Sequence, residues 1–229
     1  MSKNEQLEAL KGEIAANGAL PLASSANLVF GEGNIDCTVL FIGEAPGQKE
    51  DELKRPFVGR AGQLLNHLIE SVGWKREDVY ITNIVKRRPP ENRDPAPEEI
   101  EAYKPYLSRQ IEIINPKIIA PLGRFAMNYF LPEAKITRDQ GKVFKAGGYF
   151  IVPLLHPAAA LRSTDMMEQL EKSFRKLPDI IKACEKYESM PAGERKASGL
   201  HEPGTASPLI HLPPSREEKP KPSNQAGLF

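Results

Sequence analysis

Short apolar runs alternate with longer segments of helical periodicity along most of the chain. The apolar runs predict four buried strands, at residues 38–42, 79–82, 117–121 and 150–155. Apolar residues that recur every three or four positions predict amphipathic helices at residues 2–16, 61–72, 98–114, 123–130 and 166–186. Strands that alternate with helices are typical of a three-layer α/β/α sandwich around a mostly parallel sheet, here of four strands.

The pattern changes after about residue 190, where seven prolines lie among Ser, Lys and Glu. Such a stretch buries too little apolar surface to offset the entropy of ordering its backbone. We therefore expect an N-terminal helix and loop at residues 1–27 that pack on the core, a main domain at 28–190, and a disordered Pro-rich tail at 191–229.

Composition narrows the possible settings of the protein. The 229 residues are 40% hydrophobic and 27% charged, as in ordinary soluble domains. No apolar run approaches the roughly 20 residues that cross a bilayer, and the first residues are too polar for a signal peptide, so we expect a cytoplasmic protein. Cys37 and Cys184 are the only cysteines, which predicts two reduced thiols and no metal site.

The formal net charge is +1, so any surface that binds nucleic acid must be locally basic. In a parallel sheet, ligands bind beyond the carboxyl ends of the strands. Three loops follow predicted strands there, at residues 43–59, 83–93 and 156–162. They are the candidate site of the molecule.

The first loop reads GEAPGQKED and then RPFVG, with glycines and prolines that favour a tight turn whose amides face a ligand. It lacks the Gly-Lys-Ser/Thr ending of a phosphate P-loop. An ordinary strand-to-helix connection is the alternative interpretation of this segment.

The second loop begins with Asn83, whose side-chain amide can both donate and accept hydrogen bonds at the edge of a base. The densest basic cluster of the chain follows and suits DNA phosphates; it comprises Lys86, Arg87, Arg88 and Arg93. Alternatively, Asn83 closes a turn and the cations form a solvated face.

The third loop holds His156 before a proline, followed by three alanines, Leu161 and Arg162. An apolar side chain on a surface loop can wedge into a base stack, with Arg162 on a phosphate. A lone histidine is more often structural than catalytic, and that alternative also applies to His156.

Together these loops resemble those of the uracil-DNA glycosylase superfamily, and most closely its family 4 enzymes. The matching segments are VFGEG at 29–33, GEAPGQKEDELKRPFVGRAGQLL at 43–65, VYITNIVKRRPPENR at 79–93, QIEIINPKIIAPLG at 110–123 and HPAAALR at 156–162. The resemblance implies that residues 28–190 are the catalytic domain of a monofunctional enzyme that excises uracil from DNA, starts base excision repair, and acts as a monomer.

The resemblance also implies roles for individual residues. Glu44 and Ala45 would line the uracil pocket, and Glu50 would exclude the thymine methyl group at the C5 edge. Phe57 would stack on the flipped base, Asn83 would read its O4/N3 edge, and His156 would stabilise the departing anion at O2. The position of a catalytic Asp in a related family holds Ala45, so the candidates that orient the water are the side chains of Asn92 and Glu44.

One departure concerns a cofactor. Family 4 enzymes usually hold an iron–sulfur cluster on four cysteines, which would fall at two positions near 17–20, at Arg87 and at Tyr103. All four are absent, so we predict no cluster and expect Tyr103, Leu20 and Leu22 to fill its place by packing.

The segment QAGLF at 225–229 resembles the peptide that bacterial repair proteins insert into the sliding clamp. Gln225, Leu228 and Phe229 would be the contacts, on a flexible tether that raises the local concentration on DNA. A catalytically weak DNA-damage-binding or clamp-recruited module is the alternative function. A mononucleotide-binding protein is a third possibility, against which the missing P-loop argues.

Overall fold

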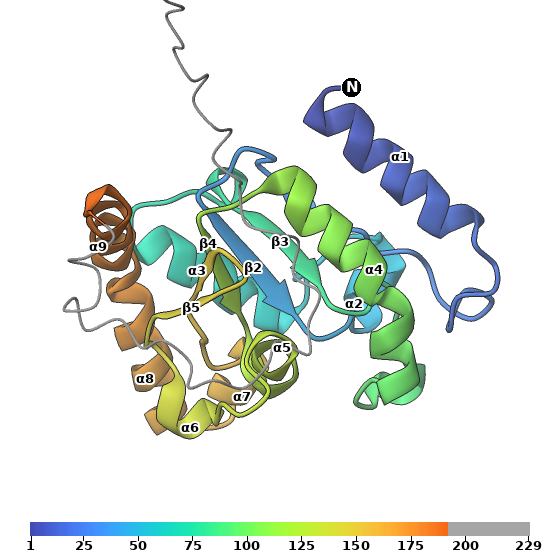
Figure 1. Ribbon diagram of the computed structural model, residues 1–229. Coiled ribbons are helices and arrows are strands. Elements are labelled where there is room, and N and C mark those ends of the chain that lie inside the picture. The colour runs from blue at the N-terminus through green and yellow to red at the C-terminus, as the bar shows by residue number, and fades with distance from the viewer. Residues whose placement is uncertain (192–229) are drawn as a thin grey trace, which may run out of the picture.

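A six-stranded sheet crosses the centre of the computed structural model, which describes residues 1–191 (Figure 1). The strands are β1 (Glu32–Gly33), β2 (Val39–Gly43), β3 (Tyr80–Asn83), β4 (Ile118–Pro121), β5 (Phe144–Ala146) and β6 (Tyr149–Ile151). Their order is β1-β3-β2-β4-β6-β5. The four inner strands are parallel, while β1 and β5 pair antiparallel at the two edges.

The predicted fold class is confirmed, and the four predicted strands correspond to the four parallel ones. The expected count of four is too low by the two edge strands. Strand β1 has two residues and β5 has three, so neither contains the apolar run by which a buried strand is recognised.

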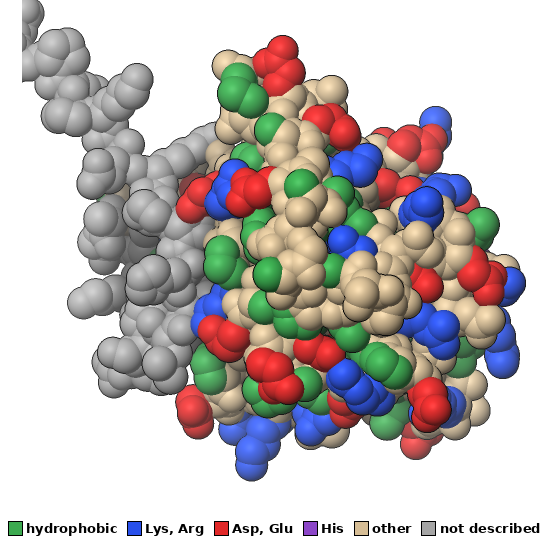
Figure 2. Space-filling model, turned by 90° about the vertical axis from the view of Figure 1, so that its right-hand side faces the viewer, with side chains coloured by type: hydrophobic (Ala, Val, Ile, Leu, Met, Phe, Trp, Pro, Cys, Tyr) green, Lys and Arg blue, Asp and Glu red, His purple; other side chains and the backbone are tan. Residues whose placement is uncertain are grey.

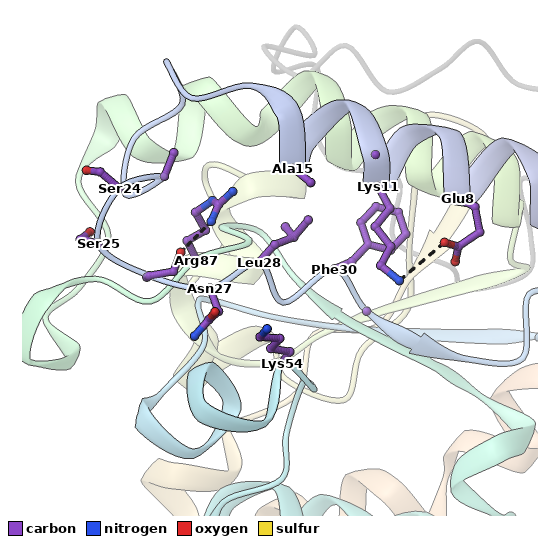
Figure 3. A pocket seen from close by; sticks show the side chains of 14 residues that line it. Glu8, Lys11, Ala15, Ser24, Ser25, Asn27, Leu28, Phe30, Lys54 and Arg87 are labelled. Carbon is purple, nitrogen blue, oxygen red and sulfur yellow. Dashed lines mark hydrogen bonds and ion pairs between the residues drawn. The ribbon is translucent and has the colours of Figure 1, made fainter.

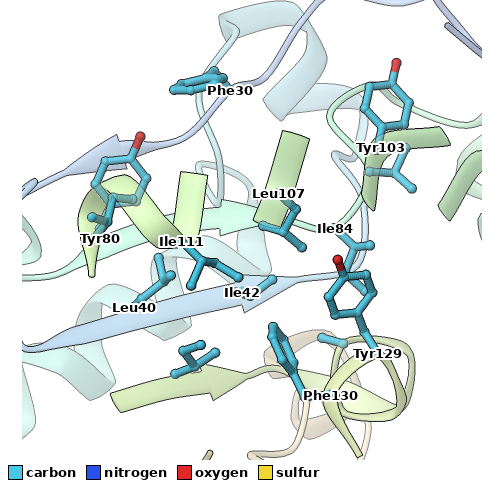
Figure 4. Close-up of a cluster of buried hydrophobic side chains, with 14 of the residues drawn as sticks. Phe30, Leu40, Ile42, Tyr80, Ile84, Tyr103, Leu107, Ile111, Tyr129 and Phe130 are labelled. Atoms are coloured by element: carbon cyan, nitrogen blue, oxygen red, sulfur yellow. The ribbon is translucent and has the colours of Figure 1, made fainter. Parts of the chain in front are cut away.

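Each face of the sheet is covered by helices, because alternate side chains of a strand point to opposite sides. In β2, Leu40 and Ile42 join the cluster under α1 (Lys3–Ala16) and α4 (Pro97–Ile114), part of which Figure 4 shows. Val39 and Phe41 join the opposite cluster, under α3 (Arg60–Ser71), α8 (Thr164–Arg175) and α9 (Leu177–Ser189). The buried β2 side chains thus belong to two separate cores that fix the sheet between two helical layers.

The predicted helix at 166–186 is wrong as a single element. The structure forms α8 and α9 with a break at Lys176, and Pro178 lies in the first turn of α9. Proline lacks the amide proton that a continuous helix needs, but it fits the first turn of a new one. The other helices are α2 (Gln48–Leu53), α5 (Gly123–Phe130), α6 (Ile136–Asp139) and α7 (Pro157–Ala160), with 3₁₀ turns at Arg76–Asp78 and Pro90–Asn92.

Helix α1 packs on α4 through Leu7, Leu10 and Ile14, all of which are buried. Among residues 1–191, each helix is too short or too polar to cross a membrane. The tail predicted at residues 191–229 lies outside the described residues except for its first position.

Candidate functional site

The loops after β2 and β3 meet beside an aromatic ring. Gly43 and Asn83 are register partners at the ends of these strands. A Cβ atom at Gly43 would collide with Asn83 Oδ1 and lie 2.6 Å from the Phe57 ring. Residue 43 must therefore be glycine for the amide and the ring to share this space.

The loop after β6 closes the same site. The ring of His156 lies 5.7 Å from that of Phe57, centroid to centroid, at a tilt of 34°. Three of the side chains expected in a base pocket, Asn83, Phe57 and His156, are thus brought together from three loops. Gly123, which opens α5, lies behind His156 with a φ of 86°, and a Cβ atom there would approach the His156 Cβ to 2.9 Å.

Asn83 presents an acceptor without a partner. Only 1% of the residue is exposed, and its buried Oδ1 makes no hydrogen bond within residues 1–191. An unpaired buried acceptor costs about 1–3 kcal/mol. An N–H group of a ligand beside Asn83 would remove that cost.

His156 can donate a hydrogen bond from Nε2. Its Nδ1 accepts a hydrogen bond of 3.1 Å from the Ala158 amide, in the N-cap of α7. Burial lowers the pKa of His156 to about 4, although the nearby Glu50 carboxylate works in the opposite direction. At neutral pH the ring is uncharged, and because Nδ1 is the acceptor, its single proton is on Nε2.

Phe57 is held in a strained conformation with a φ of 50°. A left-handed backbone is costly for a residue with a bulky side chain, on the order of 1–2 kcal/mol. The Glu50 carboxylate of α2 supports it from one side, because its Oε1 accepts from the amides of Val58 at 2.9 Å and Gly59 at 2.7 Å. Glu50 therefore links α2 to the loop that carries the ring.

Arg76 also binds the loop that carries Phe57. Its Nη2 donates to the Pro56 carbonyl at 2.6 Å and its Nη1 to the Phe57 carbonyl at 3.3 Å. The guanidinium also pairs with Glu32 at 2.9 Å. Burial pushes the pKa of Glu32 upward, but hydrogen bonds from Arg55 and Arg76 outweigh it and hold the pKa below its usual value.

The sequence did not reveal this role of Arg76. The residue lies in the charged stretch KRED, which is typical of a solvated face. Only the fold brings it to the loop that carries Phe57.

Glu44 follows directly on Gly43 and is only partly exposed. Burial is the main cause that raises its pKa to about 7, the Asp94 carboxylate adds to the increase, and Arg124 opposes it. A carboxyl group that titrates near neutrality can exchange a proton with a reacting water. Ala45, the next residue, is also only partly exposed and packs against the α1/α4 core.

Asn92, the other residue expected to orient water, is exposed in the 3₁₀ turn after β3. Its Oδ1 accepts from Arg88 Nε at 2.8 Å, and its φ is 54°. The structure thus shows a partner for Asn92 on its own loop.

The predicted basic cluster does not form one surface. Lys86 is fully buried, so the expectation that it contacts phosphates is wrong. Its Nζ instead donates to Thr82 Oγ1 at 2.7 Å, the Asn83 carbonyl at 2.8 Å and Gln110 Oε1 at 2.6 Å. The apolar residues that precede it in this strand and turn gave no sign that a lysine would enter the core.

The three arginines of the cluster differ in their surroundings. Arg87 is 6% exposed, and its Nη1 donates to the Ala26 carbonyl at 2.6 Å. Arg93 forms a two-pronged pair with Glu99, at 2.6 and 2.9 Å. Arg88 is partly exposed.

The third loop presents the side chains expected to face DNA. Leu161, which follows α7, is 39% exposed, and Arg162 beside it is exposed. Besides Leu161, the exposed large apolar side chains among residues 1–191 are Met1, Leu53 and Met166.

The positions at which cysteines would hold an iron–sulfur cluster do not fit one. Tyr103 is fully buried and donates to the Pro21 carbonyl at 2.8 Å. Leu20 belongs to the same core cluster, and Leu22 packs against it, as expected from the sequence. Cys37 and Cys184 are free thiols in different cores, and no group of three or more metal-binding side chains occurs within residues 1–191.

The segment with Gln225, Leu228 and Phe229 lies outside the described residues.

Comparison with known proteins identifies relatives over most of the chain. The family model of the uracil DNA glycosylase superfamily matches residues 30–178. The chain is 42% identical over 182 residues to the type-4 uracil-DNA glycosylase of Thermotoga maritima, covering 75% of this chain and 95% of that protein. It is 48% identical over 165 residues to the type-4 enzyme of Saccharolobus solfataricus, covering 68% and 76%. It is 43% identical over 166 residues to the type-4 enzyme of Archaeoglobus fulgidus, covering 69% of this chain and 83% of that protein.

Proposed function

Because the chain belongs to the uracil-DNA glycosylase superfamily, with type-4 enzymes among its relatives, we propose that it hydrolyses the N-glycosidic bond of uracil in DNA. The product would be an abasic site that starts base excision repair. The observation that carries the proposal is the unpaired Asn83 Oδ1, buried beside Phe57 and within a site that also contains a neutral His156.

Uracil matches these groups. Its N3–H would donate to Asn83 Oδ1, and its O4 would accept from the Asn83 amide nitrogen. The flipped base would stack on Phe57, which helps to offset the few kcal/mol that unstacking from the duplex costs. Ala45 and Glu44 would line the pocket, and Glu50 would stand beside C5 to exclude the methyl group of thymine.

Bond cleavage places negative charge on the departing uracil and positive charge on the sugar. The Nε2–H of His156 would donate to uracil O2, where charge grows as the bond breaks. A donor positioned for that charge stabilises the transition state more than the ground state. The His156 ring does not have to be positively charged for this role. With Nδ1 bound to the Ala158 amide, the neutral ring already carries a hydrogen on Nε2.

The attacking water needs a partner that removes its proton as it adds to the sugar. We assign this role to Glu44, whose pKa of about 7 leaves a large share ionised at neutral pH. Asn92 is the second candidate, as a group that positions the water.

On the DNA side, Leu161 would fill the space of the extruded nucleotide, and Arg162 would contact a neighbouring phosphate. Arg88 and Arg93 are further candidates for phosphates of the same strand. The formal net charge is +1, and Lys and Arg side chains are mixed with Asp and Glu on the face that Figure 2 shows. The contacts with DNA would therefore be local rather than spread over a basic face.

The function is tested by alkali-revealed cleavage of a labelled oligonucleotide with one uracil, single-stranded or paired with G or A. His156→Ala should lower the single-turnover rate at least about 10²-fold, the typical loss when a donor to developing charge is removed. His67→Ala is the matched control, since His67 is exposed on α3. Binding to uracil-containing DNA without cleavage by the unmodified protein would favour a damage-binding module instead.

Two further proposals concern the setting of the enzyme. We propose that Gln225, Leu228 and Phe229 bind the sliding clamp, which the QAGLF motif supports. A peptide of residues 220–229 should bind purified clamp, and substitution of Leu228 and Phe229 by Ala should abolish this. That the enzyme works as a monomer in the cytoplasm stays a prediction.

A further inference from the structure

A groove separate from the base pocket runs between α1 and the segment that leads into β1. It has a volume of about 870 Å³, and Figure 3 shows the residues that line it. One wall is α1, with Lys11 and Ala15; the opposite wall includes Asn27 and Lys54, at the end of α2.

The lining of the groove is basic. It contains the three cations Lys11, Lys54 and Arg87, while Glu8 is the one carboxylate among the described residues that line it. Glu8 lies 3.6 Å from Lys11, at one end of the groove. The charge of the lining is therefore +2 on a protein whose formal net charge is +1.

Arg87 is the strongest sign of a ligand. Its guanidinium is buried, with Nη1 bound to the Ala26 carbonyl, yet its Nε makes no hydrogen bond within residues 1–191. Hydrogen bonds to neutral groups offset only part of the cost of burying a charge. An anion in the groove beside Arg87 would offset the rest.

Neutral donors complete the lining. The hydroxyls of Ser24 and Ser25 come from the same segment as Ala26. The Asp51 carboxylate nearby is engaged by the backbone amide of Asn27 at 2.7 Å. Arginine, lysine and serine side chains are the usual partners of phosphate oxygens in complexes with DNA.

The groove lies within reach of a DNA strand that enters the base pocket. Arg87 follows Asn83 by four residues in the same loop, so their Cα atoms are at most about 14 Å apart. Successive phosphates of one strand rise by about 3.4 Å along a duplex. Arg87 is therefore within a few nucleotides of the uracil.

We propose that this groove binds a phosphodiester of the DNA strand that carries the uracil, a few nucleotides from the flipped base. Lys11 and Lys54 contact its oxygens from the two walls, with the serine hydroxyls beside them. Arg87 supplies the buried positive charge at the base of the groove. This inference rests on the proposed function.

The test measures the salt dependence of binding to an oligonucleotide with a tetrahydrofuran abasic analogue, which the enzyme cannot cleave. The variants are Lys11→Gln, Lys54→Gln and the double variant, which leave the buried Arg87 in place. Lys182→Gln is the matched control, because Lys182 is 77% exposed on α9, away from the groove. We expect the slope of log Kd against log salt to fall by about one per groove lysine and to stay unchanged in the control.

Equal slopes in the groove variants and the control would overturn the proposal. A parallel titration with inorganic phosphate distinguishes the source of the ligand. Millimolar phosphate could stabilise the unmodified protein against unfolding but not the double variant, while the DNA slope is the same in both. That result would assign the groove to a free phosphate and would also overturn the proposal. Loss of cleavage in His156→Ala together with equal salt slopes in the groove variants would support the proposed function and overturn the groove, so the two failures are distinct.

Discussion

The side-chain nitrogen of Lys86 lies 2.8 Å from the carbonyl oxygen of Asn83. The same nitrogen donates to Thr82 and Gln110, and burial lowers its pKa well below the usual value. Asn83 is the residue that would read the uracil edge, and Lys86 binds its backbone carbonyl at the end of β3. We therefore expect Lys86 to position Asn83 rather than to contact phosphate.

Lys86→Met should lower both stability and uracil excision. Methionine fills similar space but leaves three buried acceptors without their donor, which costs about 1–3 kcal/mol for each group that stays unpaired. Urea unfolding should show reduced stability, and kcat/KM should fall through a weaker hold on the base. The salt slope of DNA binding should not change. A slope reduced by about one unit at unchanged stability would instead restore the phosphate role.

Glu44 should determine the acid side of the pH–rate profile. With a pKa of about 7, its carboxylate form is lost as the pH falls below neutrality, so single-turnover cleavage should decline there. His156, with a pKa of about 4, stays neutral throughout this range. Glu44→Gln should be slower by about 10² and nearly flat from pH 5 to 8. An acid limb that persists in Glu44→Gln would assign it to another group.

The same substitution has a signature in stability. A carboxyl group with a folded-state pKa raised above 4.5 binds more protons in the folded state than in the unfolded state between the two values. The contribution of Glu44 to the stability of the unmodified protein therefore falls as the pH rises from about 4.5 to 7. Thermal unfolding should show Glu44→Gln more stable at pH 8, with the difference closing toward pH 4.5.

The parallel strands were predictable because continuous apolar runs such as TVLFI have few alternatives to burial. The candidate loops followed from their place after those strands. The environment of each cation could not be predicted, because the pattern of KRRPPENR is the same whether Lys86 points into the core or into solvent. Burial of Lys86 depends on Thr82 and Gln110, and the role of Arg76 depends on carbonyls 19 and 20 residues away, which only the tertiary structure brings close.

Gly123→Ala should impair catalysis because residue 123 lies directly behind His156. The residue has a φ of 86°, and a Cβ atom would come within 2.9 Å of the His156 Cβ, so the histidine or the start of α5 has to move. A left-handed alanine alone costs about 1–2 kcal/mol. We expect a lower Tm and a reduced single-turnover rate.

Gly12→Ala is the matched control for that variant. Gly12 lies within α1 and has open space where its Cβ would be, so alanine should stabilise the helix by up to about 1 kcal/mol. Because Gly12 also lines the groove beside α1, its single-turnover rate is compared at saturating DNA, where it should match that of the unmodified protein. Equal rates in Gly123→Ala and Gly12→Ala would show that the position of His156 tolerates the displacement.

Two variants of Glu50 should distinguish its role as a hydrogen-bond acceptor from the effect of its negative charge. Glu50→Ala removes the acceptor of the Val58 and Gly59 amides and releases the strained loop of Phe57, so kcat/KM should fall sharply. Glu50→Gln retains an oxygen that can accept these bonds and should keep more of the activity. If both variants lose the same amount, the negative charge near His156 is the important property, rather than the support of the loop.

Purified protein should contain less than stoichiometric iron, because the positions expected to bind a cluster hold a buried tyrosine and an arginine. Metal analysis of the full chain, expressed with added iron and sulfide, checks this directly.

Tyr103→Phe should then lower the stability by about 1 kcal/mol, since it removes the donor to the Pro21 carbonyl and leaves the ring packing intact. Tyr106→Phe, which removes the hydroxyl that accepts from Asn17, serves as a comparison on the same helix. Stoichiometric iron with unaltered stability in Tyr103→Phe would mean that the packing of Tyr103 does not replace a cluster.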